Sequence, residues 1–210
     1  MQISIEYGIL AILWIFWCFL HSAMISESVT RFVKRNTGKN FKFYRLFYNI
    51  VSFTTIAIPY FYGRTVHSPI LVQWNGAYQL LRYSLILLSL YLFYTGSKNY
   101  KFSQFIGIRQ IKTNKSTSVI SESDTFNTAG ILKLVRHPWY LASVIIVWSY
   151  TGVYHTTTII TSLILTFYLF IGAFIEEKKL INQFGETYLQ YQSQVSMFLP
   201  FKWLKNILWK

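Results

Sequence analysis

Long runs of apolar residues, separated by short polar and basic segments, dominate the pattern of this chain. The first three runs cover about residues 5–24, 46–62 and 80–96. A helix rises about 1.5 Å per residue, so roughly 20 residues cross a hydrocarbon core about 30 Å thick. Each run is therefore predicted to be a membrane-spanning helix.

The stretch from Trp139 to Ile175 contains no Lys, Arg, Asp or Glu. As one helix of about 37 residues it would measure about 55 Å, nearly twice the thickness of the hydrocarbon core. A turn signal lies at its middle, where Gly152 and a polar cluster around His155 interrupt the apolar pattern. The pattern thus predicts a helical hairpin of two spans, at about 139–152 and 157–175.

Basic residues are concentrated in alternate connecting segments, which indicates the topology. The segment after the first run, the loop 97–138 and the tail 176–210 are rich in Lys and Arg, whereas the N-terminus, residues 63–79 and the turn at 151–157 contain only Arg64. Cytoplasmic loops of membrane proteins carry the excess of Lys and Arg. We therefore predict five spans, with the N-terminus outside, the C-terminus in the cytoplasm, and 97–138 as a cytoplasmic loop whose residues 112–130 are a candidate lid.

The last residues, "FLPFKWLKNILWK", mix Trp with Lys in the manner of a helix that lies in the membrane interface. The predicted fold is an all-α integral membrane protein. A single membrane domain over 1–210 contains about five transmembrane helices, the last two forming a helical hairpin, followed by a C-terminal interfacial amphipathic helix.

Composition favours a membrane protein over a soluble one. Of the residues, 53% are hydrophobic and 13% are charged, whereas soluble domains usually contain about 25% charged residues. The formal net charge is +13, but the basic residues lie between the spans and set topology, so the lipid bilayer is the expected partner and no nucleic acid is expected. The single cysteine, Cys18, excludes a disulfide framework and a cysteine-type metal site, and no metal is predicted.

The predicted hairpin brings two polar clusters together at the cytoplasmic interface. One cluster is Arg136, His137 and Tyr140 in "LVRHPWY"; the other is Glu176 and Glu177 in "EEKKL". Pro138 suits the first turn of the fourth span, where its missing N–H is not needed. Taken singly, the arginine is typical of a topology anchor and the glutamates of a solvated helix end. Together they are suited to a ligand that carries cationic amino and hydroxyl groups.

These residues carry a resemblance to a known group of enzymes. "RHPWY", followed some 36 residues later by "EEKKLINQFGETYLQYQSQVSMFLP", resembles the integral-membrane methyltransferases of the isoprenylcysteine carboxyl methyltransferase and phosphatidylethanolamine N-methyltransferase group. In the N-terminal half, "FLHSAMISESV", "FYRLFYNIVS" and "FIGIRQI" are similar to the methanethiol S-methyltransferase branch and its nitric-oxide-respiration-associated relatives.

The resemblance implies a methyltransferase of the EC 2.1.1 class with S-adenosyl-L-methionine as methyl donor. It also implies a cofactor site, with Glu177 as the preferred contact of the two glutamates, formed by Val135, Arg136, His137, Pro138, Tyr140, Glu176 and Glu177. On the acceptor side, His21 with Ser22, and Arg45 and Asn49 at the start of the second span, are the candidate catalytic residues. The expected acceptor is a small thiol such as methanethiol, which reacts as its thiolate.

Two alternatives remain open at this point. The first keeps the cofactor and changes the acceptor to a lipophilic one, either a lipid amine or an isoprenylcysteine carboxylate. The second is a non-catalytic membrane protein built on the same scaffold. The identity of the acceptor and the oligomeric state are not determined by the sequence.

Overall fold

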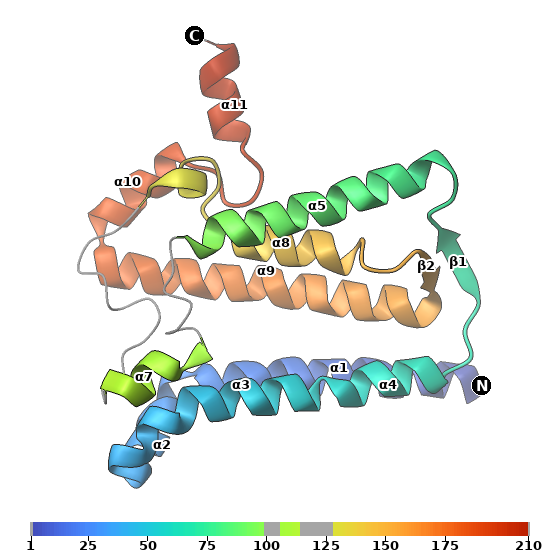
Figure 1. Ribbon diagram of the computed structural model, residues 1–210, viewed down its shortest axis with the longest axis horizontal. Coiled ribbons are helices and arrows are strands. Elements are labelled where there is room, and N and C mark those ends of the chain that lie inside the picture. Colours follow the sequence, from blue (N-terminus) through green and yellow to red (C-terminus); the bar gives the residue numbers. More distant parts are fainter. Residues whose placement is uncertain (1, 99–105, 114–127, 210) are drawn as a thin grey trace. The chain divides into compact units, whose positions relative to one another are not determined.

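The structure is a computed structural model that describes residues 2–98, 106–113 and 128–209 (Figure 1). Residues 114–127 of the predicted lid at 112–130 lie outside the described residues. The chain forms two compact units: unit 1 comprises residues 1–73, 100–122 and 153–165, and unit 2 comprises residues 74–99, 123–152 and 166–210. Helix α9 (Thr156–Phe184) contributes residues to both units.

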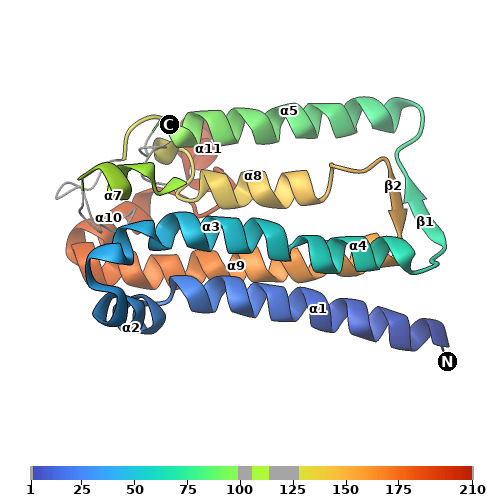
Figure 2. The same cartoon turned by 60° about the horizontal axis from the view of Figure 1, so that its bottom comes forward.

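Unit 1 is built around two rows of helix that lie side by side (Figure 2). One row is α1 (Gln2–Ile25), which continues into α2 (Glu27–Thr37). The other is α3 (Tyr44–Thr55) followed by α4 (Ala57–Thr65), and the two rows are joined by the short 3-10 helix η1 (Gly38–Phe43). The small helix α7 (Ile108–Thr113) packs on η1.

The second predicted span, at 46–62, is interrupted in the structure. Helix α3 ends at Thr55 and α4 begins at Ala57. Pro59 explains the break, because a proline has no N–H to donate to the carbonyl four residues earlier and its ring crowds that carbonyl. Pro59 is buried within unit 1.

Unit 1 also contains a two-stranded antiparallel ladder that the sequence analysis did not predict. Strand β1 (Ile70–Gln73) pairs with β2 (Val153–His155), with Ile70 opposite His155 and Gln73 opposite Val153. The strands are four and three residues long, too short for their alternating pattern to stand out among apolar runs. Apart from this ladder, the regular structure of the described residues is helical, in agreement with the predicted helical class.

In unit 2, helix α5 (Ala77–Ser97) packs along α8 (Pro138–Val147). Ser89 Oγ donates to the Ala142 carbonyl at 2.9 Å, and the Trp139 indole donates to the Phe93 carbonyl at 3.2 Å. At the far end, the guanidinium of Arg82 donates to the Ser149 and Tyr150 carbonyls at 2.8 and 3.1 Å, just beyond the last turn of α8. Unit 2 also contains the 3-10 helix η2 (Gly130–Lys133), α10 (Glu186–Gln194) and α11 (Phe201–Leu208).

Helix α8 and residues 166–184 of α9 run antiparallel within unit 2. The Trp148 indole donates to Thr166 Oγ1 at 2.9 Å. Nearer the start of α8, the ring of Tyr140 lies against Gly172, where an added Cβ would come within 3.1 Å of Tyr140 Cε1. The two segments therefore contact each other near both ends of α8. At the N-terminal end of α8, Arg136 and His137 contact Glu177 of α9.

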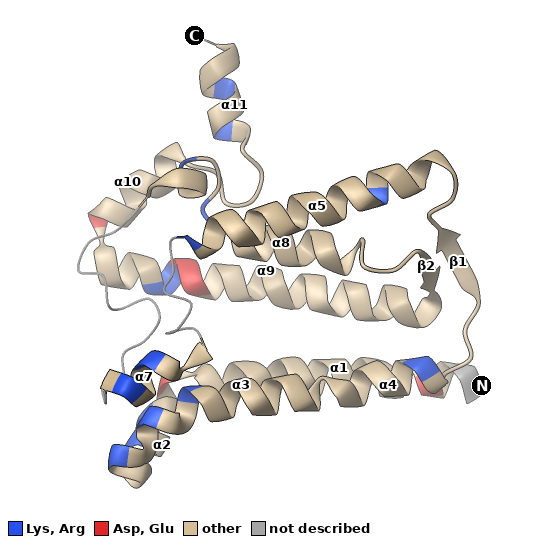
Figure 3. Ribbon diagram, in the orientation of Figure 1, with Lys and Arg blue, Asp and Glu red and all other residues tan. Residues whose placement is uncertain are grey.

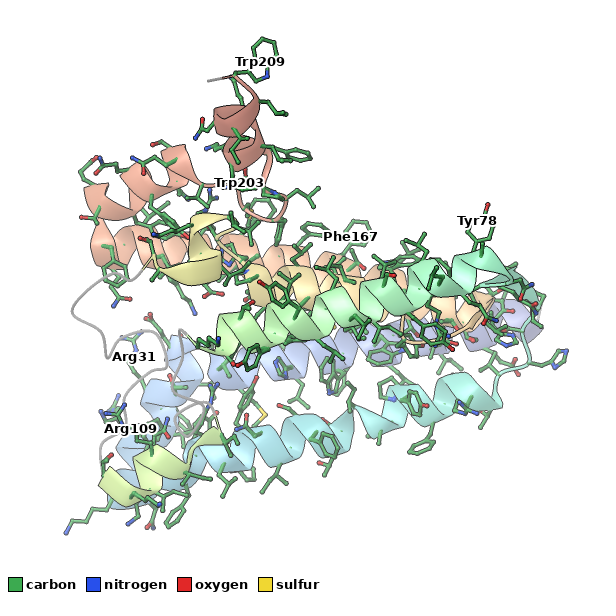
Figure 4. The ribbon with its side chains drawn as sticks, turned by 45° about the horizontal axis from the view of Figure 1, so that its top comes forward. Arg31, Tyr78, Arg109, Phe167, Trp203 and Trp209 are labelled. Carbon is green, nitrogen blue, oxygen red and sulfur yellow. The ribbon has the colours of Figure 1, made fainter. Side chains whose placement is uncertain are left out.

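Three of the described helices are long and apolar enough to cross a membrane: Ser4–Ile25 within α1, α5 and α9. Large apolar side chains on these helices are exposed, including Phe19 on α1, at 68%, and Phe167 on α9, at 66%. Figure 4 labels Phe167. Such a surface is stable against lipid tails and not against water. The chain is therefore a helical membrane protein.

Candidate functional site

The chain segment that leads into α8 is fixed by a second, distant segment. The backbone N–H groups of Arg136 and His137 donate to the Ser196 and Met197 carbonyls at 2.9 and 3.0 Å, and Val135 forms a parallel bridge with Ser196. Pro138 occupies the first turn of α8, as the sequence predicted. Arg136 and His137 are thus held rigidly at the N-terminal end of this helix.

Glu177 lies opposite them on α9 and is the centre of a dense hydrogen-bond network. Arg136 donates from Nε and Nη2 to its two oxygens at 2.9 and 2.8 Å. His137 Nε2 donates to Glu177 Oε1 at 2.6 Å. Tyr188 OH donates to Oε1 at 2.7 Å, and the Gln192 amide donates to Oε2.

These five hydrogen bonds use all the acceptor positions of the Glu177 carboxylate. A carboxylate has about four lone-pair directions, and only 8% of this side chain is exposed. Burying a carboxylate costs several kcal/mol unless charge and hydrogen bonds compensate it. The bidentate arginine and the other donors supply that compensation, so Glu177 has no oxygen left for a ligand.

The hydrogen-bond donors of the Arg136 guanidinium are likewise used within the protein. Besides Glu177, its Nη1 donates to the Gln192 and Val195 carbonyls. Its side chain is 10% exposed. Arg136 therefore ties three parts of unit 2 together, namely the entry to α8, the end of α9 and the end of α10.

Tyr188 and Gln192 were not singled out in the sequence as site residues. They reach Glu177 because Gly185, at φ 54°, ends α9 and starts α10 in a new direction, a backbone conformation that favours glycine. Their spacing of four residues on α10 is a helical signal that points to one face. Burial first, and the hydrogen bond to Glu177 second, raise the pKa of the Tyr188 hydroxyl above its ordinary value. Tyr188 consequently remains a hydrogen-bond donor at neutral pH.

Glu176, the neighbour of Glu177, has a different environment. Its carboxylate lies 4.0 Å from His137 Nδ1, and 20% of its side chain is exposed. The ring of His137 in turn contacts Tyr140 edge-on at 5.4 Å between centroids. Adjacent residues on a helix point about 100° apart, which explains why one glutamate is enclosed and the other accessible.

The candidate acceptor-side residues form a separate cluster inside unit 1. Tyr48 OH lies 2.6 Å from His21 Nε2, and the Arg45 guanidinium lies over the Tyr48 ring at 5.3 Å. The Asn49 amide donates to the Ile106 carbonyl at 3.0 Å. Tyr48, which is buried, links His21 to Arg45 and was not identified from the sequence.

The close approach of the chain at Ile106 depends on Gly107. Its φ of 98° lies in the left-handed region, and a Cβ there would come within 2.9 Å of the Leu46 backbone nitrogen. The segment before α7 is therefore pressed against the start of α3.

Among the residues that the structure describes, no group of three His, Cys, Asp or Glu side chains is arranged to hold a metal ion.

The fold and the network around Glu177 define a helical membrane protein with a buried, charged centre at the junction of α8, α9 and α10. No protein-family model and no solved structure matches the chain. Curated proteins do match it. Over 99 residues, 47% of this chain, it is 32% identical to methanethiol S-methyltransferase 1 of Bradyrhizobium diazoefficiens.

Two further relatives carry the same name. The chain is 37% identical over 81 residues to a methanethiol S-methyltransferase of a Pseudomonas species, and 38% identical over 76 residues to that of Pseudomonas deceptionensis. These matches cover 39% and 36% of this chain. The matched segments span about a third of the length of these relatives, between 29% and 34%. The resemblance to the methanethiol S-methyltransferase branch is thereby confirmed.

Proposed function

We propose that this chain is a membrane methyltransferase that uses S-adenosyl-L-methionine as methyl donor and a small thiol such as methanethiol as acceptor. The observation that carries the proposal is its similarity to several proteins named methanethiol S-methyltransferase. The cluster in unit 2 supports it, because Arg136, His137, Glu176 and Glu177, which the resemblance assigns to the cofactor site, meet at one place.

The polar groups at this cluster fit the proposed cofactor. S-adenosylmethionine presents an ammonium and a ribose diol, both of which donate hydrogen bonds to a carboxylate. Glu176 is the partly accessible carboxylate of the pair, whereas Glu177 is already occupied by five donors. We therefore assign the ligand contact to Glu176, in place of the sequence-based choice of Glu177.

Glu177 then acts as a positioning residue. It fixes the side chains of Arg136 and His137, whose backbone N–H groups are held by the Ser196 and Met197 carbonyls. Tyr140, one turn further along α8, adds an aromatic side wall beside His137. The bound cofactor supplies an electrophilic methyl group on a sulfonium sulfur, and the protein contributes by orienting the reactants and excluding water.

The roles proposed for His21, Arg45 and Asn49 concern the acceptor. A thiol is nucleophilic as its thiolate, so methyl transfer to a thiol is assisted by a group that takes up the thiol proton. His21 is the proposed proton acceptor, and Tyr48 is the residue that orients its ring.

The proposal includes the topology expected from the sequence. Five spans, the last two forming a hairpin within the membrane, a cytoplasmic C-terminus and an interfacial helix at 201–208 are consistent with a cofactor that arrives from the cytosol. The whole chain then forms one membrane domain in the cell membrane.

Calorimetric titration of the purified full chain with S-adenosylhomocysteine tests the cofactor assignment. We expect binding by the wild type and at least a tenfold weaker affinity for Glu176→Gln with an unchanged unfolding temperature. Glu177→Gln should lower stability as well, by about 3 kcal/mol, because it leaves the buried Arg136 without a counter-charge. Glu186→Gln, the same change at an exposed position of unit 2, is the matched control. Absence of binding by the wild type would refute the proposal.

Headspace analysis tests the acceptor. With S-adenosylmethionine and methanethiol supplied, we expect the full chain to release dimethyl sulfide, and His21→Ala to release at least about 100 times less, the usual contribution of a general base. Binding of S-adenosylhomocysteine without dimethyl sulfide formation, together with methylation of a lipid amine or an isoprenylcysteine carboxylate, would show that the proposed thiol acceptor is wrong.

A further inference from the structure

Unit 1 carries a concentration of positive charge at one end. The residues come from α2, η1 and α7, and the set is called the basic surface below: Arg31, Lys34, Arg35, Lys39, Arg109 and Lys112. Five of the six are exposed and Arg109 is partly exposed. Figure 3 shows the Lys and Arg positions of α2 and α7 gathered at the end of unit 1 that lies away from β1, and Figure 4 labels Arg31 and Arg109.

Helix α2 presents its charges because it is amphipathic. Val29 and Val33, four residues apart, are both partly buried and so lie on the side that faces the rest of unit 1. Arg31, Lys34 and Arg35 occupy the opposite side. Phe32 lies at the margin between the two sides and is 68% exposed, an arrangement typical of helices in the membrane interface.

The basic surface begins where a membrane-spanning helix ends. The candidate span within α1 ends at Ile25, and α2 begins at Glu27 after the single cap residue Ser26, whose side chain accepts a hydrogen bond from the Val29 N–H. With so short a connection, α2 cannot move far from the level at which α1 leaves the hydrocarbon. The basic surface therefore lies at the depth of the lipid headgroups.

Acidic residues are scarce in the chain segments that form the basic surface. Between residues 26 and 45 the chain has one acidic residue, Glu27, and between 106 and 113 it has none. Glu27 lies 4.0 Å from Arg31, and both side chains are at least 75% exposed, so this pair is weak and screened by salt. The exposed basic side chains of α2 and η1 are therefore accessible to an external anion.

We propose that the basic surface binds the phosphate headgroups of anionic phospholipids, with Phe32 inserted among the acyl chains. Clusters of four to eight Lys and Arg directly beside a transmembrane helix bind anionic lipid in this way. The exposed aromatic side chain and the position next to α1 favour lipid over nucleic acid, since a nucleic-acid surface needs access from the aqueous side. The proposal is independent of the methyltransferase activity.

The test compares lipid binding by two variants of the full chain in detergent micelles. One variant combines Lys34→Gln, Arg35→Gln and Lys39→Gln. The control combines Lys133→Gln, Lys178→Gln and Lys179→Gln, which removes the same charge from exposed positions of unit 2. Native mass spectrometry counts the bound phosphatidylglycerol and phosphatidylcholine molecules at increasing lipid concentration. Circular dichroism confirms that both variants keep the helical content of the wild type.

We expect the wild type and the control to prefer phosphatidylglycerol over phosphatidylcholine by about tenfold, and the α2–η1 variant to lose most of this preference. Raising the salt concentration should weaken the preference of the wild type. Equal binding of both lipids by the wild type, or a preference that only the control loses, would overturn the proposal. A short RNA duplex that binds the wild type more tightly than phosphatidylglycerol would overturn it as well, in favour of a nucleic-acid surface.

Discussion

At the scale of single residues, two adjacent glutamates in α9 have different surroundings in the structure. Glu177 accepts hydrogen bonds from Arg136, His137, Tyr188 and Gln192, and Glu176 stays partly accessible beside His137. A carboxylate that is already saturated stabilises the protein and holds its neighbours in place, whereas an accessible one is available to a ligand.

Tyr188 provides a test of the Glu177 network through pH. Its pKa is raised in the folded protein, so its contribution to stability is complete below about pH 10, the ordinary tyrosine pKa, and is lost as the pH rises further. Tyr188→Phe should cost about 1–2 kcal/mol at neutral pH, because Glu177 loses a donor. It should also make stability fall less steeply above pH 10.

Unfolding of the purified protein between pH 7 and 11 measures both effects. Tyr78→Phe is the matched control, since Tyr78 is 67% exposed on α5 (Figure 4), and it should resemble the wild type throughout. Identical pH profiles for Tyr188→Phe and Tyr78→Phe would mean that the Tyr188–Glu177 hydrogen bond contributes nothing.

At the scale of elements, the contact between α5 and α8 depends on one small residue. A Cβ at Gly96 would lie 2.4 Å from Trp139 Cδ1 and Nε1. The indole cannot swing away freely, because it donates to the Phe93 carbonyl on the same helix as Gly96. The position of Trp139, next to the Arg136–His137 pair, is thus set by the surface of α5.

Gly96→Ala should therefore destabilise the protein by about 1–3 kcal/mol, the usual cost of overpacking a filled contact. Gly8→Ala in α1 is the control, because a Cβ at Gly8 meets nothing within 4 Å, and alanine there should be neutral or slightly stabilising. Thermal unfolding in detergent compares the two. A loss of stability in Gly8→Ala as large as in Gly96→Ala would argue against close packing as the cause.

At the scale of the whole molecule, the apolar helices make the chain a membrane protein, and the distribution of basic residues predicts its orientation. Cys18 is the single cysteine and is buried in α1, so new cysteines can be introduced and labelled one at a time. This property allows the predicted orientation to be tested in cells.

In a Cys18→Ser background, Asn75→Cys, between β1 and α5, should react with a membrane-impermeant maleimide in intact cells. Ser193→Cys, at an exposed position of α10, should react only after the cells are permeabilised. These outcomes follow from an outside N-terminus, with two predicted spans before Asn75 and five before Ser193. The reverse labelling pattern would mean that the chain has the opposite orientation.

The sequence by itself was sufficient for the class of protein, the long helices and the resemblance. Runs of apolar residues specify α1, α5 and α9 through length and composition alone, since a helix in lipid must satisfy its own backbone. The motif residues at 136–140 and 176–177 indicated the wider membrane methyltransferase group. The segments "FLHSAMISESV", "FYRLFYNIVS" and "FIGIRQI" indicated the methanethiol S-methyltransferase branch, which the curated relatives confirm. These properties depend on local sequence.

Only the tertiary structure decided which glutamate of the candidate site is enclosed and which is accessible. Glu176 and Glu177 are the same residue type at adjacent positions, and their difference comes from what lies around each of them. Gly185 turns the chain between α9 and α10, so that Tyr188 and Gln192 contact Glu177. Pro138 begins α8 just after Arg136 and His137, and Arg136 there lies within hydrogen-bonding distance of Glu177. Burial and hydrogen-bond saturation depend on contacts between distant segments, and those contacts exist only once the chain has folded.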